Sequence, residues 1–172
     1  MICCVTGHRS KGFPFSREDE GPKYIDYIDT LRREIEKLMR EDYRYFISGM
    51  AEGADMDFAV EVIALRAGKE NIKLEAALPY PISKTKRPTA YSEARDDVLL
   101  VCDYKTIVSP CYHKGCMQKR NQYMVDKSDL VLAIWNGERS GGTWNTIQYA
   151  QSVGKPIRYI LLKDMGKRFG IK

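Results

Sequence analysis

Short apolar runs rich in β-branched residues alternate along this chain with longer segments whose apolar residues recur at helical spacing. The apolar runs lie at 2–6, 43–48, 72–78, 105–109, 129–135 and 156–162, and the helical segments at 23–41, 54–68, 90–103, 116–128 and 143–153. This alternation is typical of an α/β protein, because parallel neighbouring strands need a crossover helix. We therefore expect a Rossmann-like, doubly wound, mainly parallel sheet with helices on both faces.

The chain has 172 residues and shows no internal repeat and no linker, so one domain over residues 1–172 is expected. Its apolar runs are far too short to span a bilayer, and the N-terminus enters a strand at residue 2 without a visible signal peptide. We expect a cytoplasmic protein with no membrane partner.

The net charge of +5 is concentrated in two segments. The loop "KTKR" (84–87) and the terminal segment 163–172 each contribute +3, so the remainder of the chain carries −1. A solvated loop and a solvated tail explain this pattern better than a broad basic face does, so nucleic acid is the less favoured partner.

The five cysteines are an odd number, which argues against a disulfide framework in a cytoplasmic protein. Cys111, His113 and Cys116 lie close together, but no second ligand pair with zinc spacing appears elsewhere. We expect no metal and no other cofactor.

In an open parallel sheet, ligands bind outside the carboxyl ends of the strands, near the point where strand order reverses. The first strand is followed by "TGHR" (6–9). Gly7 permits a close backbone approach, and His8 and Arg9 can direct donors at an anion. A glycine turn followed by two solvated residues is the alternative.

The second strand is followed by "SGMAEGAD" (48–55), where Ser48 and Gly49 precede a helix that opens after Gly53. Unpaired N–H groups at such a helix start can hold a phosphate. Glu52 can accept hydrogen bonds from ribose hydroxyls, and Asp55 can contact the ligand or complement the helix dipole. The spacing is not G-x-G-x-x-G, which disfavours a standard NAD dehydrogenase.

Two further segments complete the candidate site. On the helix at 116–128, Arg120 and Asn121 are a candidate pocket-facing pair, although a single helical Arg is commonly solvated. After the fifth strand, Gly141 and Gly142 precede a helix that Thr143 is expected to cap. These three residues form the predicted phosphate cradle, together with Gly7, Gly49 and Gly53.

Together, "VTGHR", "SGMAEGAD", "MQKRNQYMVDKSDLVLAIWNG" and "GGT" resemble the SLOG superfamily of Rossmann-like nucleotide-ligand domains, and within it the YpsA-like group. The likeness covers essentially the whole chain, with the motifs in the expected order. It implies a nucleotide pocket at the sheet edge and, by analogy, a homodimer.

Two relatives in that superfamily imply different activities. The LOG phosphoribohydrolases resemble this chain at Met117 and Arg120 and at Gly142 and Thr143, but Thr146 occupies the position of their catalytic glutamate. Glu52 or Asp55 would then have to supply the acid. The DNA-processing protein DprA has a segment like "SGMAEGAD" and binds single-stranded DNA.

We therefore expect a protein that binds a nucleoside phosphate or an ADP-ribose-like or NAD-derived molecule, as a sensor or ligand-binding protein. A nucleotide N-glycosidase and a single-stranded DNA-binding protein are the alternatives. Arg9 and Arg120 would neutralise phosphate charge, and Asn121 or Glu52 would contact the sugar. On this interpretation Arg120→Ala abolishes binding and leaves the melting temperature of the free protein nearly unchanged.

Overall fold

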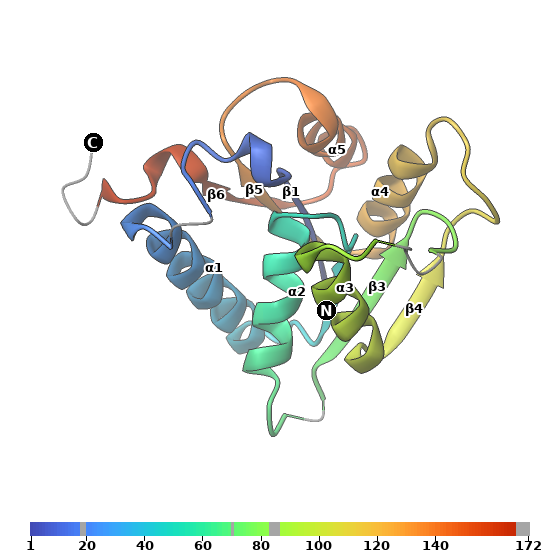
Figure 1. The fold of residues 1–172 in the computed structure, drawn as a ribbon, viewed down its shortest axis with the longest axis horizontal. Helices are drawn as coiled ribbons and strands as arrows, with labels where there is room; N and C mark the ends of the chain where they lie inside the picture. Colours follow the sequence, from blue (N-terminus) through green and yellow to red (C-terminus); the bar gives the residue numbers. More distant parts are fainter. Residues whose placement is uncertain (18–19, 70, 83–86, 168–172) are drawn as a thin grey trace.

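The computed structural model describes residues 1–17, 20–69, 71–82 and 87–167 (Figure 1). Within these residues, six strands form one sheet and five α-helices pack against it. The strands are β1 (Ile2–Gly7), β2 (Tyr45–Ser48), β3 (Lys73–Leu78), β4 (Tyr104–Ile107), β5 (Leu130–Trp135) and β6 (Ile157–Leu161). The helices are α1 (Pro22–Arg40), α2 (Ala54–Leu65), α3 (Ala90–Val101), α4 (Cys116–Lys127) and α5 (Gly141–Ser152). The predicted fold class is confirmed.

The strand order is β4-β3-β2-β1-β5-β6, and each strand runs parallel to its neighbours. From β1 the chain builds outward through β2, β3 and β4, and then returns to the other side of β1 for β5 and β6. The strand order therefore reverses between β1 and β5, whose carboxyl ends lie side by side where Gly7 is paired with Ile134. This junction is where an open parallel sheet forms its ligand crevice.

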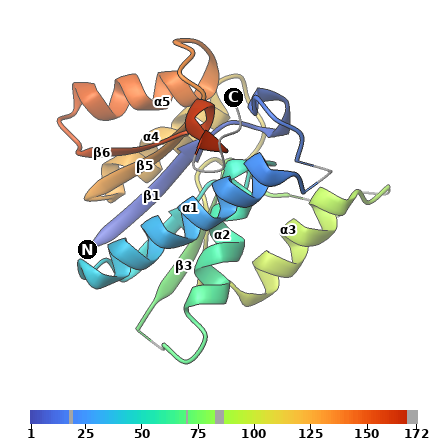
Figure 2. The same ribbon diagram turned by 90° about the vertical axis from the view of Figure 1, so that its left-hand side faces the viewer.

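The two faces of the sheet carry separate cores. Helices α1, α2 and α3 cover one face (Figure 2), where Cys3, Phe46 and Leu74 are buried. Helices α4 and α5 cover the other face, where the next residues along the same strands, Cys4 and Ile47, are buried. The alternation follows from the two-residue period of a strand, and a sheet buried on both faces explains the nearly continuous apolar runs.

Helix α4 is fastened to the sheet by a buried carboxylate, Glu75 in β3. Its oxygens accept hydrogen bonds from Tyr45 at 2.6 Å, from Tyr123 at 2.6 Å and from the Lys127 ammonium at 2.7 Å. Burial raises the pKa of Glu75, but these hydrogen bonds outweigh burial and hold the pKa below its usual value. Tyr123 and Lys127 belong to α4, so this network orients the helix that also carries Arg120.

The helix after β5 starts earlier than the sequence suggested. It begins at Gly141, so Thr143 lies inside the first turn and does not cap the helix. The residue before the helix is Ser140, whose side chain makes no capping hydrogen bond with the described residues. The side-chain hydroxyl expected to cover this helix end is therefore not in that position.

The terminal segment is packed for as far as it is described. Met165 is buried, and the Gly166 amide donates to Asp26 Oδ2 on α1 at 2.6 Å. Residues 83–86, in the basic loop, and 168–172, in the predicted tail, lie outside the described residues. No helix in the described part of the chain is long and apolar enough to cross a membrane.

Candidate functional site

A pocket of about 310 Å³ lies at the carboxyl ends of β1 and β5, where the strand order reverses. It contains eight of the predicted site residues, namely Gly7, His8, Arg9, Asp55, Arg120, Asn121, Gly142 and Thr143. Val5, Thr6, Gly12 and Ala51 also line it, and sequence reasoning did not select them as site residues. Their small or apolar side chains carry no signal for a site, since they become lining residues only through the fold. Met117, which the sequence analysis noted only for its resemblance to the LOG enzymes, lines the pocket as well.

Arg120 is the buried cation of this pocket, because its side chain is only 7% exposed. Its guanidinium donates to the Gly49 carbonyl and lies 3.7 Å from Asp55 Oδ2. Arg120 Nε has no hydrogen-bond partner among the described residues. Burying a guanidinium with one N–H group unpaired costs free energy, so we expect a ligand to supply an acceptor for this group.

Asp55 faces Arg120 from the first turn of α2, and its side chain is 9% exposed. Burial raises the pKa of this carboxyl, and Arg120 opposes that rise. Burial likewise lowers the pKa of Arg120, against the attraction of Asp55. Each group therefore depends on the other to remain charged inside the protein.

Gly49 makes room for this ion pair. A Cβ at Gly49 would lie 2.6 Å from Asp55 Oδ2 and would overlap the Arg120 guanidinium. The neighbouring Ser48 hydroxyl donates to the Asp55 carbonyl at 2.7 Å and accepts from the Met50 amide at 3.1 Å. Ser48 and Gly49 thus shape the turn around Asp55 and do not line the pocket.

Gly53 marks a contact between two loops. Its φ of +97° lies in the left-handed region, and a Cβ there would lie 2.5 Å from the His8 carbonyl oxygen. The Ala54 amide, the first of α2, donates to that same oxygen at 3.1 Å. The start of α2 is therefore closed by the loop after β1, and its N–H groups do not form the open anion site that the sequence suggested.

The start of α5 differs, because it lies open beside the pocket. A Cβ built on Gly141 or Gly142 meets no atom within 4 Å, and Gly142 and Thr143 line the cavity. The first turn of α5 contains no acidic residue. Its N–H groups therefore carry the positive end of the helix dipole without a carboxylate to neutralise it.

Thr146 takes a structural part on the same helix. Its hydroxyl accepts from Asn121 Nδ2 at 2.8 Å and donates to the Gly142 carbonyl at 2.9 Å. It is buried and joins α4 to the first turn of α5. This link keeps Asn121 beside the helix start and contributes no acid to the pocket.

Glu52 lies outside this pocket. It is exposed and accepts a hydrogen bond from Ser10 Oγ at 3.0 Å, facing a second cavity that lies against α1 and α2. Gly53 lines that second cavity as well. Asp55 is therefore the carboxylate that lines the pocket between β1 and β5.

His8 and Arg9 also line the pocket. Burial lowers the pKa of the half-buried His8, so its imidazole is neutral at pH 7. Arg9 is exposed at the rim. The pocket thus combines one exposed cation, one buried ion pair and one open helix start, which together suit a ligand with an anionic end and polar hydroxyls.

Comparisons with known proteins identify a family and several relatives that match most of the chain. The model of the YspA SLOG family matches residues 3–165. The chain is 28% identical over 145 residues to the uncharacterised prophage-derived protein YoqJ of Bacillus subtilis, covering 77% of this chain and 84% of the relative. It is 22% identical over 168 residues to a UPF0398 protein of Bacillus pumilus (95% and 89% covered) and 19% identical over 171 residues to the UPF0398 protein YpsA of B. subtilis (95% and 94% covered).

Proposed function

Because the chain belongs to the YspA SLOG family, we propose that it binds a nucleotide-derived small molecule in the pocket between β1 and β5, as a sensor or ligand-binding protein. The observation that carries the proposal is Arg120, a buried guanidinium with an unpaired Nε in a pocket that also contains the open start of α5. A phosphate supplies acceptors for both.

In this proposal the phosphate lies on the N–H groups at Gly142 and Thr143, with Arg9 closing over it from the rim. Asn121 and Asp55 face the sugar, and the Asp55 carboxylate accepts hydrogen bonds from hydroxyl groups.

The size of the pocket favours a nucleoside monophosphate over NAD or ADP-ribose. A volume of about 310 Å³ is at the lower end of the range of about 300–1,000 Å³ that small-molecule sites occupy. A molecule with two nucleotide halves would have to leave one half in solvent.

A nucleotide N-glycosidase is the second candidate, and the raised pKa of Asp55 is the observation that favours it. A buried carboxyl that retains its proton more readily can protonate a leaving base. Thr146 occupies the position of the catalytic glutamate in the LOG enzymes, and Glu52 faces the other cavity, so Asp55 is the acid to test. Release of free base from a nucleoside monophosphate, lost in Asp55→Asn, would establish this activity.

The first test is a thermal-shift panel with AMP, other nucleoside monophosphates, ADP-ribose, NAD and a short single-stranded oligonucleotide. A ligand at a hundred times its Kd adds about 2.7 kcal/mol, or roughly 5–11 °C for a chain of this size. A response to the oligonucleotide alone would favour DNA binding and overturn the proposal.

Gly142 offers a matched pair of variants for the same panel. Its position is open, so both Gly142→Asp and Gly142→Asn should fold. The aspartate complements the helix dipole and should raise the melting temperature of the free protein slightly, yet it should repel a phosphate. We expect at least a tenfold loss of AMP affinity in Gly142→Asp relative to Gly142→Asn. Equal affinities would overturn the proposal that the phosphate binds at the start of α5.

A further inference from the structure

The loop after β1, segment 8–17, contributes residues to both cavities. Its early residues His8, Arg9 and Gly12 line the pocket between β1 and β5. The second cavity, of about 960 Å³, is lined from the same segment by Ser10, Phe15, Ser16 and Arg17. The contacts that fix this segment therefore decide where two residues of the proposed ligand site, His8 and Arg9, are placed.

The early part of the segment is held through its backbone. The Ala54 amide donates to the His8 carbonyl at 3.1 Å, and a Cβ at Gly53 would lie 2.9 Å from Arg9 Cα. Asn136 Nδ2, in the loop after β5, donates to the Gly12 carbonyl at 3.2 Å. These contacts fix the backbone on both sides of Arg9.

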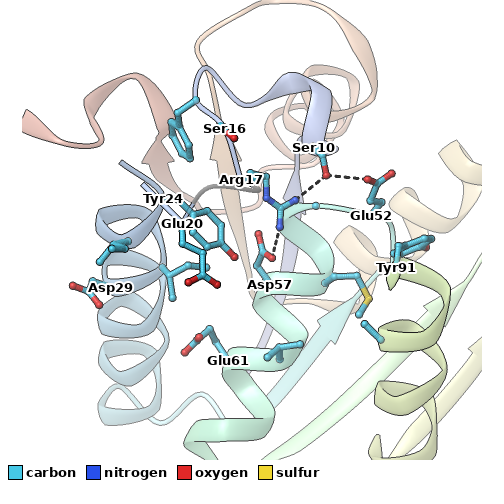
Figure 3. Close-up of a pocket in the computed structure, with 17 residues that line it drawn as sticks. Ser10, Ser16, Arg17, Glu20, Tyr24, Asp29, Glu52, Asp57, Glu61 and Tyr91 are labelled. Atoms are coloured by element: carbon cyan, nitrogen blue, oxygen red, sulfur yellow. Dashed lines mark hydrogen bonds and ion pairs between the residues drawn. The ribbon is translucent and has the colours of Figure 1, made fainter. Parts of the chain in front are cut away.

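The far end of the segment is held by the side chain of Arg17 (Figure 3). Arg17 Nη2 forms an ion pair with Asp57 Oδ1 at 2.6 Å, and Nη1 donates to Ser10 Oγ at 3.0 Å. The Ser10 hydroxyl in turn donates to Glu52 Oε1 at 3.0 Å. The contacts thus run from Asp57 on α2 through Arg17 to Ser10, the residue that follows Arg9 directly.

Asp57 is a rigid anchor for this series of contacts. Its side chain is 10% exposed, and its Oδ2 accepts a hydrogen bond from the Tyr27 hydroxyl on α1 at 3.0 Å. The Arg17 guanidinium also lies 4.8 Å from the centre of the Phe13 ring. A planar guanidinium that bonds a carboxylate and a hydroxyl at once permits few geometries, so it fixes the segment more firmly than a single hydrogen bond would.

We propose that the Arg17–Asp57 ion pair holds segment 8–17 in the position that presents Arg9 to the ligand of the pocket between β1 and β5. Arg17 and Asp57 are positioning residues, because neither of them lines that pocket. The inference rests on the proposed nucleotide function and adds a means of regulating the same site. When the ion pair is lost, Ser10 and Arg9 lose their anchor and ligand binding weakens.

Protonation of Asp57 is the event that breaks the ion pair. Burial raises the pKa of Asp57 to about 6, although Arg17 and Tyr27 oppose the rise. The charged and titratable groups that face this carboxyl come from the segment and from α1 and α2, namely Arg17, Tyr24, Tyr27, Asp55 and Glu61. Above pH 6 the carboxyl is ionised and the pair is intact, whereas below pH 6 it is neutral. Ligand affinity should therefore fall as the pH is lowered through 6.

Calorimetric titration with AMP, at pH 7.5 and at pH 5, compares the intact protein with Asp57→Asn. The amide has nearly the shape of the carboxyl but no charge. We expect the Kd of the variant to be weaker by about five- to tenfold at pH 7.5, and to lie within about twofold of the intact protein at pH 5, where Asp57 is itself neutral. Taking the ratio of Kd values at each pH cancels the titration of AMP and of His8. Equal Kd values at pH 7.5, or the same ratio at both pH values, would overturn the inference.

Glu61→Gln is the matched control. Glu61 is also a buried carboxylate of α2 held by an arginine, since Arg32 Nε and Nη2 donate to it at 2.8 and 3.2 Å, but this pair joins α2 to α1. Its Kd for AMP should equal that of the intact protein at pH 7.5. An equal loss in Glu61→Gln and Asp57→Asn would show a general disturbance of α2 and reject the positioning role.

Hydrogen exchange without ligand provides a second readout. The Gly12 and Phe13 amides, which donate to the Arg9 and Ser10 carbonyls, should exchange at least about fivefold faster in Asp57→Asn at pH 7.5, whereas Leu132 in β5 should not change. Unchanged exchange at Gly12 and Phe13 would overturn the inference. An intact protein that fails to bind AMP overturns the nucleotide proposal together with this one, whereas AMP binding with equal Kd values in Asp57→Asn overturns this inference alone.

Discussion

Asp55 on α2 and Arg120 on α4 form a buried ion pair that joins the two helical layers across the carboxyl edge of the sheet, with Arg120 Nη1 3.7 Å from Asp55 Oδ2. The two residues are 65 positions apart in the chain. Their side chains are 9% and 7% exposed, so neither charge can be satisfied by bulk water.

Arg120→Ala should therefore destabilise the free protein, contrary to the sequence-based expectation of an unchanged melting temperature. Removing one partner leaves the Asp55 carboxylate buried and unpaired, which costs about 3–5 kcal/mol. We expect this loss of unfolding free energy in urea titrations, and a loss under about 0.5 kcal/mol for Lys119→Ala on the exposed side of α4. A change below 1 kcal/mol in Arg120→Ala would show that the pair is not buried in solution.

Gly49 and Gly142 should respond in opposite directions to the same substitution. Gly49→Ala forces a Cβ against Asp55 and the Arg120 guanidinium and should cost about 1–3 kcal/mol. Gly142→Ala meets open space within a helix and should stabilise the protein by up to about 1 kcal/mol. Urea unfolding of both variants measures these changes. An unfolding free energy of Gly49→Ala equal to that of the wild-type protein would argue against the tight contact of Gly49 with Asp55 and Arg120.

Thr146 should tolerate serine but not valine. Thr146→Val has nearly the same shape but removes the hydroxyl that joins Asn121 Nδ2 to the Gly142 carbonyl, at a cost of about 1–2 kcal/mol. Thr146→Ser retains the hydroxyl and should lose less. If the two variants unfold at the same urea concentration, the hydroxyl bridge contributes nothing to stability.

Stability should fall as the pH rises through the titration of Asp57. Burial raises the pKa of Asp57 to about 6 in the folded protein, compared with about 3.9 for an unfolded aspartate. The folded state therefore holds this proton more tightly, so its contribution to stability is complete below pH 4 and is lost as the pH rises through 6. The loss amounts to about 3 kcal/mol.

The measurement is the unfolding free energy of the wild-type protein and of Asp57→Asn at pH 4, 5, 6 and 7. The unfolding free energy of Asp57→Asn, relative to that of the wild-type protein, should rise by up to about 3 kcal/mol between pH 4 and pH 7. A constant difference would mean that Asp57 titrates normally in the fold.

Much of the fold could be predicted because its signals are local. The observed strands and helices begin and end within about two or three residues of the sequence-based bounds, because each depends on the spacing of its own apolar residues. The start of α5 is the instructive difference. A Gly-Gly-Thr sequence suggests a threonine cap, yet the helix extends back through both glycines to Ser140.

The candidate site was predicted in part. Glycine-rich segments after β1, β2 and β5 and the Arg120–Asn121 pair pointed to the carboxyl edge of the sheet, where the structure has a pocket lined by eight of the predicted residues. Whether a given residue lines the pocket depended on packing. Gly53 lies against the His8 carbonyl, and Glu52 faces Ser10 and the second cavity, which lies against α1 and α2. This second cavity had no sequence signal, since its walls come from α1, α2, α3 and the segment 10–17.

The sequence by itself determined the α/β class, the parallel sheet and the family, because periodicity and short motifs are properties of neighbouring residues. Only the tertiary structure decided that Arg120 is a buried partner of Asp55, that the start of α2 is closed and that the start of α5 is open. The reason is that burial and pairing depend on groups far apart in the chain, whose positions are set by how helices from opposite faces meet at the edge of the sheet.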